Sequence, residues 1–85
     1  MGVIRIGRVT NFLSKIGVAV IELESGLSAG DKIVLKGGQR AFEQVVDSMQ
    51  INNQNVDNAA KGELVGVKVR QKVKQNDIVY KIQIL

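Results

Sequence analysis

The sequence predicts an all-β protein: a six-stranded antiparallel Greek-key-type barrel that is closed and carries one short helical turn. Two observations lead to this fold class. One turn motif occurs three times, and the core must consist mainly of Val, Ile and Leu because aromatic residues make up only 4% of the chain. Branched apolar side chains favour the half-buried surface of a sheet. A chain of 85 residues is expected to form a single domain, residues 1–85.

The repeated turn consists of a residue that accepts positive φ, followed by an acidic residue. Glycine adopts positive φ without a Cβ clash, and Asn is among the next most tolerant residues. The acidic side chain can accept hydrogen bonds from nearby backbone N–H groups and fix the turn. We therefore expect three pairs of structural turn residues, each at the start of a strand: Gly30 and Asp31, Gly62 and Glu63, Asn76 and Asp77.

The first half of the chain is expected to form three strands. Residues 3–12 form the first, with a bulge at Gly7, where the apolar alternation loses its phase. Residues 16–24 form the second, which has apolar side chains on both faces. The third strand lies between the Gly30-Asp31 turn and Gly37-Gly38, a dipeptide typical of hairpin turns.

The second half is expected to form three more strands and the helical turn. Residues 39–51 are long enough for one bent strand with a bulge at Asp47-Ser48, and residues 52–55 form a polar loop. Residues 56–61 are expected to close one helical turn. The clean alternation of apolar and polar residues then predicts the last two strands, residues 65–74 and 78–84.

The order of these motifs resembles the second domain of the translational GTPases, the β-barrel of elongation factor Tu and its relatives. The matching motifs are Gly7-Arg8-Val9, Leu27 to Ile33, Ala59 to Gly66, and Asn76 to Val79. The resemblance implies a translation-factor barrel in a stand-alone, elongation-factor-like form. The motif order also looks like the C-terminal barrel appended to some collagenase-like peptidases. A Gly-x-x-x-x-Gly-Lys-[Ser/Thr] phosphate loop is absent from the sequence, so GTPase chemistry is not implied.

The composition argues against catalysis. His and Cys are both absent, which removes the usual general base, the thiol nucleophile and thiolate metal ligands. Glu22 and Glu24 alternate along a strand, as the residues of a solvated edge do. We therefore expect no enzyme activity, no metal and no cofactor. The sequence also lacks cysteine, a secretory signal and a long apolar segment, which predicts a soluble cytoplasmic protein without membrane contact.

All of the net charge of +4 lies in the last third of the chain. Lys68, Arg70, Lys72 and Lys74 would share one face of the fifth strand, where alternate residues are about 6.6–6.8 Å apart. This distance is close to the phosphate spacing of an extended single strand. These four residues are candidate RNA-binding residues that would contact RNA or the ribosome through phosphates. The alternative is that they keep the strand soluble and discourage edge pairing.

A second candidate site consists of Val18, Val20 and Val34, which face outward in the predicted register. Exposed apolar patches usually mark protein interfaces. The alternative is a one-residue error in register, which would turn the three side chains inward. Two functional hypotheses follow. The first is a non-enzymatic, translation-factor-like module that binds RNA or a ribonucleoprotein. The second is a protein-protein interaction or oligomerisation module, for example the detached accessory barrel of a collagenase-like peptidase.

Overall fold

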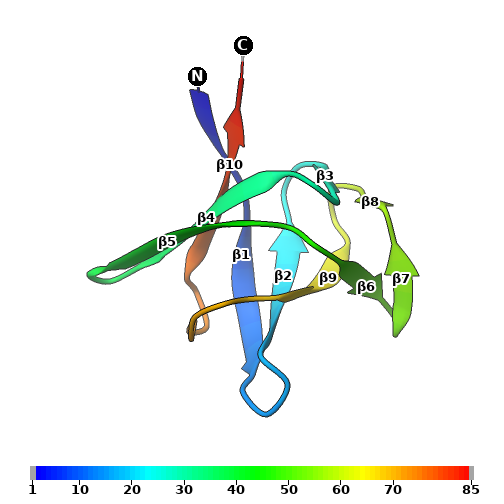
Figure 1. Cartoon of the computed structure of the whole chain (residues 1–85), viewed down its shortest axis with the longest axis horizontal. Coiled ribbons are helices and arrows are strands. Elements are labelled where there is room, and N and C mark those ends of the chain that lie inside the picture. The colour runs from blue at the N-terminus through cyan, green and yellow to red at the C-terminus, as the bar shows by residue number, and fades with distance from the viewer. Residues whose placement is uncertain (1, 85) are drawn as a thin grey trace.

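The computed structural model describes residues 2–84, which form strands, turns and irregular segments (Figure 1). The all-β prediction is confirmed. Since no helix occurs among the described residues, none of them forms a helix able to cross a membrane. The strands are β1 (Gly2–Leu13), β2 (Val18–Leu23), β3 (Leu27–Ser28), β4 (Lys32–Gly37), β5 (Arg40–Val45), β6 (Met49–Ile51), β7 (Gln54–Val56), β8 (Asn58–Ala59), β9 (Leu64–Lys68) and β10 (Ile78–Gln83).

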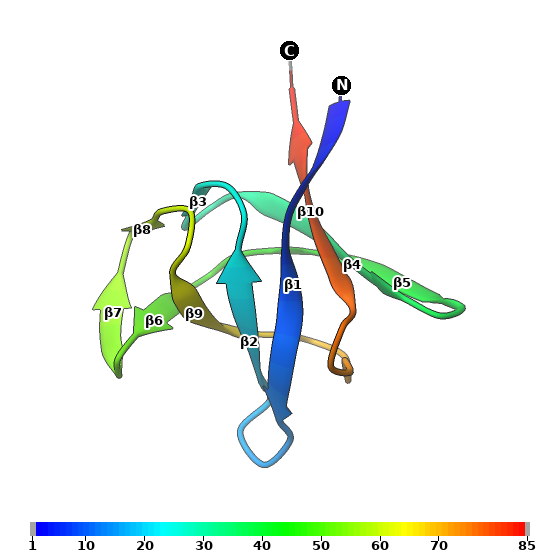
Figure 2. The same ribbon diagram turned by 180° about the vertical axis from the view of Figure 1, so that it is seen from behind.

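Eight of these strands form one antiparallel sheet in the order β5-β4-β10-β1-β2-β9-β6-β7, and β3 pairs with β8. Figure 2 shows β10, β1 and β2 side by side, with the β4–β5 hairpin behind them. The strands at the two ends of the sheet, β5 and β7, are not paired with each other. The prediction of a closed six-stranded barrel is therefore wrong: the sheet is strongly curved but open.

The predicted bulge in the first strand is confirmed. The register of β1 against β10 shifts between Arg5 and Gly7, and this shift lets both Ile6 and Val9 point into the core, where they are fully buried. A Cβ on Gly7 would lie 2.9 Å from Ile21 Cγ2, so glycine also allows β2 to approach. Ile6 is the extra residue of this bulge, and its insertion explains why the apolar alternation of the sequence loses its phase at Gly7.

The predicted fourth strand is two strands in the structure. Residues 46–48 are irregular and carry the chain from β5, at one end of the sheet, to β6 near the other. Val46 is held at this crossing because its N–H donates to Asp31 O and its carbonyl accepts from Gly30 N–H, each at 2.8 Å. The segment is a crossover between distant strands, so the bulge predicted at Asp47-Ser48 is wrong.

The predicted helical turn is also wrong. Asn52 and Asn53 both have positive φ, 51° and 65°, and form a two-residue turn that pairs β6 with β7. Such turns suit hairpins because their twist matches that of the flanking strands. Further along, Ala59 pairs with Leu27 of β3. The backbone groups of this segment thus bond to other strands instead of forming a helical turn.

One apolar cluster fills the inside of the curved sheet. Its members come from nearly every strand and from the irregular segment after β9. No described side-chain N or O atom is buried without a hydrogen-bond partner. The fully buried larger side chains are Ile6, Val9, Ile21, Leu23, Leu27, Ile33, Leu35, Val46, Met49, Val65, Val67 and Val73.

Candidate functional surfaces

The three repeated turns share one geometry. Gly30, Gly62 and Asn76 have positive φ of 93°, 92° and 77°. In each turn the following acidic residue donates its N–H to the carbonyl three residues earlier at 3.1 Å, and its carboxylate accepts the N–H of that same earlier residue. These carboxylate bonds are Ser28 N to Asp31 Oδ2, Ala60 N to Glu63 Oε1 and Lys74 N to Asp77 Oδ2, at 2.9, 2.7 and 2.9 Å.

Side chains bridge the open side of the sheet, and a buried one among them is Gln44. Gln44 of β5 is 7% exposed. Its amide donates to Lys68 O at 2.8 Å and accepts the Arg70 N–H at 2.9 Å. The amide thus forms the two hydrogen bonds that a neighbouring backbone would form in a closed barrel. We call this junction the seam. Beside it lies a cavity of about 470 Å³ lined by Gln44, Val45, Asp47, Ser48, Lys68, Val69 and Arg70.

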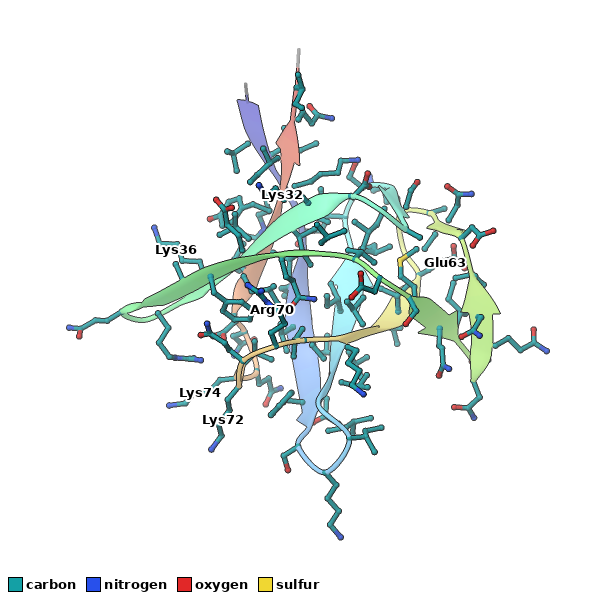
Figure 3. The ribbon with its side chains drawn as sticks, in the orientation of Figure 1. Lys32, Lys36, Glu63, Arg70, Lys72 and Lys74 are labelled. Carbon is teal, nitrogen blue, oxygen red and sulfur yellow. The ribbon has the colours of Figure 1, made fainter. Side chains whose placement is uncertain are left out.

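The four basic residues proposed to contact RNA are all exposed, but they do not form a ladder on one strand. β9 ends at Lys68, and the irregular residues after it run alongside β5 (Figure 1). The Arg70 side chain bonds to Glu43 O at 2.7 Å. Figure 3 shows Lys72 and Lys74 pointing away from the body. The strand predicted over residues 65–74 therefore stops at Lys68, and of the four basic residues only Lys68 belongs to a strand.

Val18 and Val20 lie on the outer face of β2 and are half-buried. They line an apolar groove of about 360 Å³ together with Leu13, Ile16 and Leu64, which are 40%, 59% and 54% exposed. We call this the β2 groove. Its polar lining is uncharged and comes from Gln50, Asn52 and Asn53. Gly66 lies in the floor beside Val18, where an added Cβ would crowd Val18 Cγ1 at 3.2 Å.

Val34 is not part of the β2 groove. It lies on β4, three positions away from β2 in the sheet, and is paired with Tyr80 of β10. Ile82 lies on the same face of β10 as Tyr80, because alternate residues of a strand share a face. Ile84 follows just after the end of β10, and Val3 of β1 is paired with Ile82. We call this second apolar surface the β10 stripe; its residues are Val3, Val34, Tyr80, Ile82 and Ile84.

Two ion pairs separate the two apolar surfaces. Both Glu24 carboxylate oxygens bind the Arg5 guanidinium, at 2.9 and 3.1 Å, and Arg8 lies 3.3 Å from Glu22. Sequence reasoning placed the three valines in one candidate interface because strand order was not known. It also left Leu13 outside the first predicted strand, residues 3–12, whereas β1 ends at Leu13. The signal that could have revealed the groove is the pair of large apolar residues, Leu13 and Ile16, flanking a short polar turn.

The described residues contain no cluster of three or more side chains suited to holding a metal ion. The acidic turn residues are committed to backbone bonds, and Asp77, 7% exposed, also binds the Arg40 guanidinium at 3.2 Å. Among the described residues, the features open to a partner include two apolar faces, the seam cavity and exposed basic residues.

The comparisons with known proteins connect this chain to peptidases. It is 50% identical over 78 residues to an uncharacterised protease of Methanocaldococcus jannaschii, a match that covers 91% of this chain and 19% of that protein. It is 35% identical over 80 residues to a collagenase of Porphyromonas gingivalis, again 19% of that protein. The chain thus spans about a fifth of the length of the curated relatives it matches. No family model matches the sequence.

A solved structure shares the fold of this chain. The C-terminal domain of a Geobacillus thermoleovorans U32 peptidase superposes with a TM-score of 0.86 at 20% identity, covering 92% of this chain and 91% of that one. The RNA-binding function proposed for the four basic residues has no support among the relatives, and the resemblance to a translation factor is wrong. The turn motifs on which it rested specify β turns and strands, features that proteins of many functions share. This chain is similar in sequence to a protease and collagenases and has the fold of a U32 peptidase C-terminal domain.

Proposed function

We propose that this chain is a non-catalytic accessory module of a collagenase-like peptidase and that it binds an uncharged polypeptide segment in the β2 groove. The observation that carries the proposal is the extent of the sequence match: 91% of this chain corresponds to one-fifth of a protease. A match of that kind is what a separable module of a larger enzyme produces. The lack of His and Cys supports a role other than that of the peptidase centre.

The lining of the β2 groove supports a polypeptide as its ligand. Leu13, Ile16 and Leu64 supply apolar surface that water covers poorly. Gln50 and Asn53 carry side-chain amides, each of which has both donor and acceptor atoms and can bond to peptide N–H and C=O groups. Since no charged residue lines the groove, a neutral, partly apolar segment suits it better than an acidic or basic one.

The test is binding of fluorescent gelatin, an unfolded polypeptide derived from collagen, to the purified chain at low and high salt. We expect binding that changes little with salt, because the groove contacts are apolar and neutral. The double variant Leu13→Asp/Ile16→Asp should weaken binding by about tenfold or more, a loss of about 1.4 kcal/mol or more. A matched variant, Lys72→Glu/Lys74→Glu, should bind as the unchanged chain does.

Two results would overturn the proposal. One is the absence of gelatin binding at any salt concentration. The other is binding that falls steeply with salt and is lost in Lys72→Glu/Lys74→Glu but not in Leu13→Asp/Ile16→Asp, since that pattern would assign the contact to the basic residues. Both double variants change exposed side chains, so their folding is checked by urea denaturation, where surface substitutions usually have small effects.

A further inference from the structure

We propose that the β10 stripe is the surface on which the catalytic portion of a longer peptidase chain packs. This inference rests on the proposed accessory function, but it concerns a different face from the β2 groove. In this arrangement the module carries two apolar surfaces with separate partners. The groove receives a polypeptide ligand, and the stripe holds the module against the enzyme that acts on that ligand.

The geometry of the stripe is that of an unpartnered sheet face. Val34 and Tyr80 are paired across β4 and β10, and Ile82 and Val3 are paired across β10 and β1. The body of the protein half-buries Val34, Tyr80 and Ile82. Exposure then rises toward the chain ends, to 59% at Val3 and 87% at Ile84. Contiguous apolar residues of this kind are what interfaces bury.

The position of the stripe identifies its occupant. In the Geobacillus thermoleovorans neighbour the corresponding domain is C-terminal, so the rest of that protein precedes the strand equivalent to β1. Gly2 at the start of β1 pairs with Gln83 at the end of β10, and Figures 1 and 2 show the two chain ends leaving the body together. The stripe therefore lies where the preceding domain is attached, and a short covalent connection raises the effective concentration of that domain at this face.

The charged residues that share the outer face with the stripe are partly paired within the module. The Arg5 guanidinium is bound by both carboxylate oxygens of Glu24. On β4, Lys32 and Lys36 share the face of Val34. Lys32 lies 3.6 Å from Glu43, whereas no ion pair is found for Lys36 among the described residues. An apolar centre with a polar rim is the usual anatomy of a protein interface. Because the centre of the stripe is apolar and most of the charges beside it have partners, the complementary face of the catalytic portion is expected to be mainly apolar.

The experiment uses a full-length chimera of the Methanocaldococcus jannaschii protease in which its matching 78-residue segment is replaced by this chain. Two double variants are made in the chimera: Val3→Asp/Ile84→Asp in the stripe and Leu13→Asp/Ile16→Asp in the groove as the matched control. The readouts are the radius of gyration from small-angle X-ray scattering and the rate of limited proteolysis at the junction between the two parts. Gelatin binding by the isolated chain is measured for the same variants.

We expect the unmodified chimera to be compact. The stripe variant should enlarge its radius of gyration and accelerate junction cleavage by about tenfold, whereas the groove variant should do neither. In the isolated chain the stripe variant should leave gelatin binding intact. An extended unmodified chimera, or equal behaviour of the two variants, would overturn the inference without touching the proposed function. Dimerisation of the isolated chain that Val3→Asp/Ile84→Asp abolishes would also overturn it, by identifying a second copy as the occupant.

Discussion

The side-chain oxygen of Gln44 accepts a hydrogen bond from the backbone N–H of Arg70 at 2.9 Å, while the Gln44 nitrogen donates to Lys68 O. One buried side chain thus joins the two sides of a sheet whose end strands do not pair. A second side chain, Arg70, adds a bond back to Glu43 O. At this point of the open, curved sheet, side-chain hydrogen bonds replace the backbone hydrogen bonds that two paired strands would form.

Removing the Gln44 amide should therefore destabilise the fold. In Gln44→Leu the side chain keeps a similar size, but the Lys68 carbonyl and the Arg70 N–H lose their partners. We expect a loss of about 1–3 kcal/mol in the free energy of unfolding, the cost of leaving buried polar groups unpaired. Urea denaturation followed by circular dichroism measures it. The control is Gln75→Leu, at an exposed position; equal stability of the two variants would show that the seam contributes nothing.

Gly37 is expected to be intolerant of substitution because of Asp77. A Cβ at Gly37 would collide with the Asp77 carboxylate. That carboxylate cannot move freely, because it accepts the Lys74 N–H and binds the Arg40 guanidinium. Gly37→Ala should cost about 1–3 kcal/mol, the range typical of overpacking. Gly2→Ala, which meets no atom within 4 Å, is the control in the same denaturation experiment. Equal free energies of unfolding for the two alanine variants would show that the Asp77 carboxylate is not held in place by these bonds.

The turn at Gly62 tests backbone strain separately from packing. A Cβ there would meet nothing within 4 Å, yet φ is +92°. We expect Gly62→Ala to cost about 1 kcal/mol or more, because a positive φ is unfavourable for alanine. Gly26→Ala provides the control: its Cβ would make an ordinary contact with Ala59 O, 3.6 Å away, and its φ is not positive. The measurement is the melting temperature of each variant. An equal decrease for Gly62→Ala and Gly26→Ala would contradict a conformational requirement at Gly62.

Local chemistry made β1, β2, β4, β9 and β10 predictable, together with the β1 bulge. The alternation of Val65 and Val67 fixes which face of β9 is buried, and the phase break at Gly7 marks the extra residue. Both depend on sequence neighbours alone. Local patterns also misled: the alternation continues through Val69 and Val73, both buried, although the strand ends at Lys68. A valine can be buried from an irregular segment as well as from a strand.

Long-range pairing was not predictable from the sequence. The crossing at Val46 depends on bonds to Asp31 and Gly30 that no local pattern reveals. The same limit affected the candidate site. Val18 and Val34 look equivalent in sequence, but strand order places them on different surfaces, with the Arg8–Glu22 ion pair between β1 and β2. The role of Gln44 depends on strand order too, since its partners lie 24 and 26 residues further along the chain.

The central claim is that this chain serves a peptidase by binding and does not itself catalyse hydrolysis. The most direct measurement is collagen hydrolysis by the Porphyromonas gingivalis collagenase in three forms: unmodified, lacking the 80-residue segment that this chain matches, and with this chain in its place. The isolated chain is assayed alongside. We predict that the deletion raises KM while kcat changes less, that this chain restores KM, and that the isolated chain hydrolyses nothing. Hydrolysis by the isolated chain, or a deletion that leaves KM unchanged, would contradict the account.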